Sequence, residues 1–396
     1  MRAVDHGAHS GWSLAIWYNP RWRALLSQAI LVIIVVWFGY GIISNTIHNI
    51  QRQNIASGFG FLNRTASFGV SQSLIPYSED QSYGRVFIVG LLNTVLVSVI
   101  GIVLATLLGF VLGIMRLSKN WLIANISAIY VESLRNIPPL LQLLFWYFAV
   151  LSTLPSPRKS LSLSDVFFLN NRGFFIPRIL FEPEFEWVTV LLILAIIATF
   201  FLSLWAKRRH ARTGRRIPLG WLGLVLIVGL PTLGFFVLGT PANLDFPHLK
   251  GFTFIGGIKI IPECIAVILA LTLFTAAFIA EIVRSGIMAV SQGQKEAAAA
   301  LGLHPRTILR LVVMPQAIRV IIPPLTSEYL NLIKNSSLAV AVGFPELVSV
   351  FAGTTLNQVG QAVEIILMTM AVYLSLSILS SVLMNWYNAR MALVER

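Results

Sequence analysis

The sequence predicts an all-α, polytopic membrane protein with about eight transmembrane helices, on the evidence of its composition and its apolar runs. The chain has 396 residues, of which 56% are hydrophobic and only 11% charged, whereas soluble domains carry about 25% charged residues. Several stretches lack charge for the roughly 20 residues needed to cross a hydrocarbon core of about 30 Å. Such stretches form helices, because lipid offers no partner to an unpaired backbone amide.

Eight apolar runs are long enough to span the membrane. The first follows a polar start with no small-residue cleavage site, so we expect a retained anchor and not a signal peptide. We expect the spans at about 25–44, 86–115, 123–152, 188–206, 219–239, 263–288, 318–343 and 362–387.

The positions of lysine and arginine predict the orientation, because these residues collect in cytoplasmic loops. The basic clusters are Arg21 with Arg23, Arg116 with Lys119, 207–216, 294–315, and Arg390 with Arg396. Eight spans put all of these clusters on one side, together with both termini. The loops at 45–84, 153–186, 240–262 and 344–361 are then expected on the outer side.

Two spans contain proline pairs. Pro138 and Pro139 lie inside the third span, and Pro323 and Pro324 lie inside the seventh. Because proline removes a backbone donor and kinks a helix, the sequence predicts a discontinuous helix at each pair.

Charged side chains also occur inside the spans, where charge is costly unless it faces protein or water. They are Glu132, Arg135, Glu281, Arg284, Glu328 and Lys334. Glu132 with Arg135, and Glu281 with Arg284, are three residues apart, so each pair can meet on one helix face. We interpret the second pair as structural neutralisation. Arg135 and Asn136 directly precede the first proline pair, which favours a role in a translocation pathway.

The segment "QKEAAAALGLHPRTILRLVVMP", residues 294–315, differs from its apolar neighbours. Alanine, glutamate, lysine and leucine favour a helix as far as Leu301. Gly302 then ends the helix, and Pro305 suits the first position of another. The sequence predicts a helix, a sharp turn and a second helix outside the bilayer, an arrangement that presents its end to a partner.

This segment carries a specific spacing: Glu296, Ala297 and Ala298, three residues, Gly302, nine residues, then "VVMP". It resembles the EAA loop of permease subunits of binding-protein-dependent ABC importers. The strings "ESLRNIPPLLQLLFWYF" and "NLIKNSSLAVAVGFPEL" are similar to the polar amino acid uptake subfamily. The extra spans resemble the larger, Q-type permease subunit of the general L-amino-acid transporters of Gram-negative bacteria.

The resemblance implies a type I ABC importer permease fold with a core of five helices. The chain would divide into an arm with an extra helix and periplasmic loop at 1–85, core helices at 86–152, an insertion with two extra helices at 153–262, core helices at 263–388, and a cytoplasmic tail at 389–396. The implied location is a bacterial inner membrane.

The resemblance also implies functional residues and partners. The coupling residues would be Glu296, Ala297, Ala298 and Gly302, and the substrate-binding residues would be Glu132, Arg135, Asn136, Lys334, Asn335, Ser336 and Ser337. Subfamily members that carry cationic amino acids often have aspartate where this chain has Asn335, so we expect a broad range of L-amino acids. The implied partners are two copies of an ABC ATPase, a second permease subunit, a periplasmic amino-acid-binding protein, and membrane lipid.

Absences in the sequence bound the function as well. There is no G-x-x-x-x-G-K-[ST] phosphate-binding loop, so ATP and Mg would be bound by a partner ATPase. We expect no cofactor or metal in this chain, no enzyme activity of its own, and no nucleic-acid binding despite a net charge of +13. Two alternatives stay open. One is an ion-driven secondary transporter with Glu328 or Glu132 as proton carrier, and the other is a membrane sensor or scaffold in which Lys334 and Asn335 pack inertly.

Overall fold

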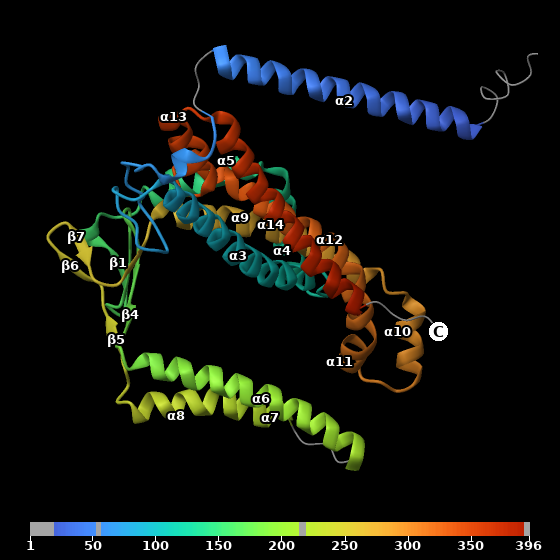
Figure 1. The fold of residues 1–396 in the computed structure, drawn as a ribbon. Helices are drawn as coiled ribbons and strands as arrows, with labels where there is room; N and C mark the ends of the chain where they lie inside the picture. Colours follow the sequence, from blue (N-terminus) through green and yellow to red (C-terminus); the bar gives the residue numbers. More distant parts are fainter. Residues whose placement is uncertain (1–19, 53–56, 214–218, 392–396) are drawn as a thin grey trace, which may run out of the picture.

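The computed structural model describes residues 20–52, 57–213 and 219–391 and consists mostly of long helices (Figure 1). In these residues, seven helices are long and apolar enough to cross a membrane, and eight if one bent pair counts as a single span. This confirms the predicted polytopic helical fold.

The helices fall into long spans and short connecting pieces. The α-helices are α2 (Pro20–Arg52), α3 (Tyr83–Met115), α4 (Trp121–Asn136), α5 (Pro139–Leu144), α6 (Phe185–Thr213), α7 (Leu219–Leu224), α8 (Leu230–Val237), α9 (Pro262–Met288), α10 (Gln292–Ala300), α11 (Pro305–Ile308), α12 (Met314–Asn335), α13 (Leu356–Val359) and α14 (Ala362–Met391). The 3-10 turns are η1 (Gly60–Asn63), η3 (Pro157–Lys159) and η6 (Ser336–Val342), and the π-helical turns are η2 (Phe145–Leu151), η4 (Val225–Gly229), η5 (Leu309–Val313) and η7 (Val348–Thr355).

The centre of the bundle is the packing of α3 against α9. A Cβ atom on Gly109 would lie 2.6 Å from the Cβ atom of Ile279, and one on Gly113 would lie 2.7 Å from the carbonyl oxygen of Ala280. The two glycines stand four residues apart, the spacing that lets membrane helices approach closely. α4 and α12 pack around this pair, and α14 packs against α12.

The loops that the sequence predicts on the outer side contain short β-strands, which no sequence pattern indicated. The strands are β1 (Leu161–Leu163), β2 (Phe167–Asn170), β3 (Gly173–Ile176), β4 (Arg178–Phe181), β5 (Ala242–Asp245), β6 (His248–Lys250), β7 (Thr253–Ile255) and β8 (Ile258–Ile260). They form a four-stranded sheet, β1-β2-β3-β8, and the pairs β4-β5 and β6-β7. The all-α expectation therefore holds for the spans, and the inserted loops add small antiparallel sheets.

Contacts between the loops support the predicted topology. β3 and β8 come from the two loops at 153–186 and 240–262, and they pair with Phe174 opposite Ile260. The side chain of Asn93 donates to the carbonyl oxygens of Gln72 and Pro345, which join the other two outer loops. Figure 1 shows the strands at one end of the bundle and α10 with α11 at the opposite end.

The helices α2, α6, α7 and α8 stand outside the bundle. α2 lies apart from the other helices, and its apolar stretch is not buried at all within the chain. α6 packs against α8, where a Cβ atom on Gly234 would lie 2.3 Å from Leu191 Cδ1. In Figure 1 this hairpin is joined to the bundle through the strands.

The predicted break at Pro323 and Pro324 is wrong. α12 continues through both prolines, and the helical geometry changes only at Ser336, where η6 begins and runs to Val342. Membrane helices tolerate internal proline when neighbouring helices and local adjustments satisfy the freed carbonyl groups. The turn ends at Gly343, whose φ of 73° is left-handed.

Candidate functional site

The predicted break at Pro138 and Pro139 is confirmed. α4 ends at Asn136, α5 begins at Pro139, and the two segments are bent by 106°. Buried Gln142 stabilises the bend, because its Nε2 atom donates to the carbonyl oxygens of Leu134 at 2.9 Å and Ile137 at 3.0 Å. Sequence reasoning missed Gln142, although it is the one polar residue in the apolar run after the prolines.

The side chains before the bend lie on an exposed face of α4. The Arg135 guanidinium stands over the ring of Phe278 in α9, 5.0 Å from its centroid. The Asn136 Nδ2 atom donates to the Glu132 carbonyl oxygen at 2.7 Å. The Glu132 carboxylate faces Arg116, with 3.8 Å between Oε1 and Nη2, so this ion pair takes the place of the expected pair with Arg135.

The pair in α9 forms as expected. Arg284 Nη2 lies 2.6 Å from Glu281 Oε1. Arg116, at the end of α3, contacts the same carboxylate through Nη1. Sequence reasoning used Arg116 only as an orientation signal, because its partner Glu281 lies 165 residues further along the chain.

The second predicted group lies where α12 ends. The Ser336 hydroxyl is buried and donates to Ile333, and the Ser337 hydroxyl donates to Lys334, both at 2.7 Å. Lys334 is exposed and Asn335 is half-buried. Each hydroxyl oxygen keeps lone pairs that can accept a hydrogen bond.

α12 also carries a polar face that sequence reasoning missed. Ser327, Asn331 and Lys334 are all exposed, at spacings of four and three residues. These spacings place the three side chains on one side of the helix. η6, which follows this face, packs against α5, so the end of α12 adjoins the segment after the bend in α4.

The predicted helix-turn-helix is confirmed at the opposite end of the bundle from the strands (Figure 1). Gly302 has a left-handed φ of 75° at the turn, and the His304 ring accepts from the Arg306 amide at the start of α11. In α10, Ala298 is buried, while Glu296 and Ala297 are exposed.

An apolar side chain marks the outer surface of this turn. Leu301 is 80% exposed, directly before Gly302. The turn thus presents apolar surface outside the bundle, as a docking element does.

A buried carboxylate ties the segment after η6 to α14. Glu346 accepts hydrogen bonds from the Val348 and Ser349 amides, both at 2.8 Å, and from the Tyr373 hydroxyl at 3.0 Å. The carboxyl lies outside the candidate spans. Burial raises its pKa from 4.5 to about 7. No sequence pattern indicates these contacts, because Tyr373 belongs to a separate helix.

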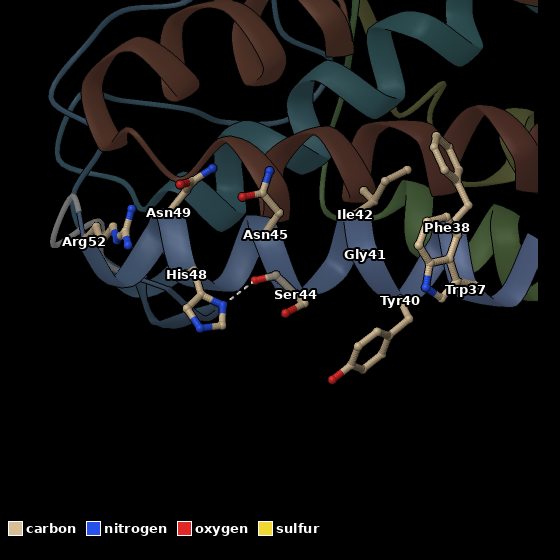
Figure 2. Close-up of a pocket in the computed structure, with 10 residues that line it drawn as sticks. All are labelled: Trp37, Phe38, Tyr40, Gly41, Ile42, Ser44, Asn45, His48, Asn49 and Arg52. Atoms are coloured by element: carbon tan, nitrogen blue, oxygen red, sulfur yellow. Dashed lines mark hydrogen bonds between the residues drawn. The ribbon is translucent and has the colours of Figure 1, made fainter.

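Other features do not add to this site. A pocket lies along the C-terminal half of α2 and is lined by ten residues between Trp37 and Arg52, which Figure 2 labels. All of them belong to one helix, and its polar part from Ser44 onward follows the apolar stretch. Within the ranges that the structure describes, no three histidine, cysteine, aspartate or glutamate side chains gather as metal ligands.

A helical bundle with a broken span, polar faces on spanning helices and an exposed helix-turn-helix at one end is typical of a membrane permease. The chain belongs to the family of binding-protein-dependent transport system inner membrane components, whose profile matches residues 208–393. It is the permease component of an ABC importer and not the ATPase. This confirms the resemblance and contradicts the ion-driven and non-transporting alternatives.

Several known proteins are similar along most of the chain. The general L-amino acid transport system permease protein AapQ of Rhizobium johnstonii is 52% identical, over 100% of this chain and 99% of the relative. The glutamate/glutamine/aspartate/asparagine transport system permease protein BztB of Rhodobacter capsulatus is 40% identical over 96% of each chain. A chain of an amino acid ABC transporter crystallised with histidines aligns with 20% identity and a TM-score of 0.47, over 78% of this chain and 95% of the other.

Proposed function

We propose that this permease imports a broad range of L-amino acids. The observation that carries the proposal is the 52% identity, over the full chain, with a general L-amino acid permease. The neutral amide of Asn335 supports it, because an amide donates and accepts hydrogen bonds without favouring a charged side chain.

The proposed pathway lies between the bend in α4 and the end of α12. An amino acid needs a cation for its carboxylate and acceptors for its ammonium group. Arg135 and Lys334 would supply the cations. The amide and hydroxyl oxygens of Asn136, Asn335, Ser336 and Ser337, with the Glu132 carboxylate at the inner end, would supply the acceptors.

We divide the chain into a transporting core and the segments that are added to it. Residues 1–85 and 153–262 contribute the outlying helices and the outer loops, while 86–152 and 263–388 form the transporting core. Residues 389–396 would form a cytoplasmic tail, which the structure describes only as far as Met391 at the end of α14. With both termini in the cytoplasm, the turn at Gly302 faces the cytoplasmic ATPase and the strands face the periplasm.

The proposed partners follow from this orientation. Two copies of an ABC ATPase would bind ATP and Mg, and one would seat Glu296, Ala297, Ala298 and Gly302 in a groove. A second, related permease chain would complete the pathway and dock on the other ATPase copy. A periplasmic binding protein would deliver the amino acid, and ATPase closure would switch the core between outward-open and inward-open states.

Competition between amino acids tests the substrate range. Uptake of one labelled neutral amino acid would be measured in membrane vesicles that contain the complete importer, with each unlabelled L-amino acid added in turn. We expect neutral, amide and acidic amino acids to compete. Uptake that only arginine, lysine and histidine reduce would contradict the proposed range.

A further inference from the structure

An ion-pair network joins three helices at the inner end of the bundle. Arg116, the residue after α3, contacts Glu281 of α9 through Nη1, and its Nη2 atom lies 3.8 Å from Glu132 Oε1 of α4. Glu281 also binds Arg284 of its own helix. Arg116 is therefore the residue of this network that bridges separate helices.

The two arms of Arg116 differ in burial. The Arg116 and Glu281 side chains are only 15% and 25% exposed, whereas Glu132 is 71% exposed. Charge pairs that are removed from water interact more strongly than exposed pairs. The contact with Glu281 thus fixes the guanidinium to α9, and the longer, exposed contact with Glu132 is one that breaks and re-forms at low cost.

α3 and α9 move together with α10. The close packing at Gly113 leaves no room for α3 to slide along α9. α9 ends at Met288, and α10 begins at Gln292, so few residues separate the spanning helix from the docking turn. A displacement of α10 is therefore passed to α9 and to Arg116.

α4 is tied to this unit at three levels. The Ser127 hydroxyl donates to the Leu112 carbonyl at 2.7 Å, and the Tyr130 hydroxyl donates to the Leu273 carbonyl at 2.9 Å. The Arg116–Glu132 contact comes next along α4. It lies one turn before Asn136, where the helix bends, so it holds the bent end together with Arg135, whose guanidinium stands over Phe278 of α9.

We infer that Arg116 is a positioning residue that couples the docking turn to the translocation pathway. The inference rests on the proposed function. When the ATPase moves α10, Arg116 carries the motion across α9 to Glu132, and the end of α4 with Arg135 and Asn136 shifts with it. Arg116 itself does not contact the amino acid.

A matched pair of substitutions tests this role in the complete complex, reconstituted in proteoliposomes with its ATPase, second permease and binding protein. Arg116→Gln removes the bridge between helices. Arg284→Gln removes a cation from the same Glu281 carboxylate but bridges no two helices. The quantity measured is the number of amino acids imported per ATP hydrolysed.

We expect Arg116→Gln to lower this ratio by about tenfold while ATP hydrolysis continues, since residues between two sites alter coupling by such amounts. Arg284→Gln should leave it within about twofold. Glu132→Gln breaks the exposed arm and also alters a proposed acceptor for the amino acid, so it should reproduce at least part of the loss. The double variant Arg116→Gln/Glu132→Gln should lose less than the two single losses combined, because Arg116→Gln already lacks the Arg116–Glu132 contact.

The outcomes are distinguishable. Equal ratios for Arg116→Gln and Arg284→Gln, in a complex that transports normally as wild type, would overturn this inference alone. A wild-type complex without uptake would overturn the proposed function. If the complex with Arg116→Gln does not assemble, the test uses the complex with Glu132→Gln. An unchanged number of amino acids imported per ATP in that complex overturns the inference.

Discussion

At the scale of single residues, the most informative side chains are polar groups with partners far away in the sequence. Glu346 is buried, yet it accepts three hydrogen bonds. A buried carboxyl is costly to ionise even when donors surround it. The raised pKa of Glu346 therefore makes the stability of the protein depend on pH.

The stability of the fold should depend on pH through Glu346. Its pKa is about 7 in the folded protein and 4.5 when unperturbed, so between these values the folded state binds more protons than the unfolded state. Stability falls as pH rises through this window, by on the order of 3 kcal/mol. Thermal unfolding in detergent measures the effect. Near pH 4.5 the Glu346→Gln variant should be as stable as the wild-type protein, and above about pH 7 the variant should be more stable.

The control is the stability of the Glu346→Gln variant as a function of pH. This stability should not show the fall that the titration of Glu346 causes in the wild-type protein. If wild-type stability does not change through the window, and Glu346→Gln is less stable throughout, then Glu346 is ionised at every pH tested. That result would contradict the account of this residue.

At the scale of elements, α3 and α9 depend on the absence of side chains at their contact. A Cβ atom on Gly109 would lie 2.6 Å from both the Cβ and Cγ2 atoms of Ile279. Gly109→Ala should destabilise the protein by about 1–3 kcal/mol, the usual cost of overpacking. Thermal unfolding in detergent measures the effect.

Gly101→Ala is the matched control. Its Cβ atom would come no closer than 3.3 Å to the flexible end of Leu332. We expect this variant to unfold close to wild type. A similar loss of stability in both variants would show that the close approach at Gly109 is not the cause.

The docking turn is the second element with a specific requirement. Gly302 has a φ of 75°, which costs other residues about 1–2 kcal/mol. Gly302→Asp should therefore deform the turn and lower ATPase recovery about tenfold, equivalent to about 1.4 kcal/mol. Affinity purification of the tagged permease, with the co-purifying ATPase quantified, checks this.

Gly293→Asp supplies the same charge at an exposed position of the same segment. Gly293 has nothing within 4 Å and no left-handed φ, and an acidic residue is favourable in the first turn of a helix. ATPase recovery should match wild type. Equal losses in both variants would mean that charge, and not the shape of the turn, disrupts docking.

Sequence patterns predicted those elements that depend on local chemistry. The apolar runs, the bend after Asn136 and the turn at Gly302 each follow from residues within a few positions. The presence of a proline pair was not enough to predict a break in the helix. The pair at Pro138 interrupts a helix, whereas the pair at Pro323 lies inside a continuous one. Packing against neighbouring helices decides between these outcomes, and one sequence does not show it.

The candidate site could be predicted only where its residues stand out within a few positions of the sequence. Arg135 and Lys334 stand out as charges inside apolar runs. Gln142 and Arg116 act on groups that become neighbours only in the fold, so no spacing in the sequence marks them. The strands share this property, since β3 and β8 come from loops separated by two helices.

At the scale of the whole molecule, the chain separates a transporting bundle from outlying helices. Figure 1 shows α2 and the α6–α8 hairpin away from the packed helices, while α10 and α11 extend from one end. The bundle holds the polar faces, and the turn holds the exposed apolar Leu301. In the proposed mechanism, the energy for transport reaches the bundle through the turn.

The most direct test of this account is uptake of a labelled amino acid by proteoliposomes that contain the complete importer, with ionophores present to abolish ion gradients. The account predicts uptake that requires ATP and the binding protein and that ionophores do not change. Uptake that proceeds without ATP and disappears with ionophores would contradict it.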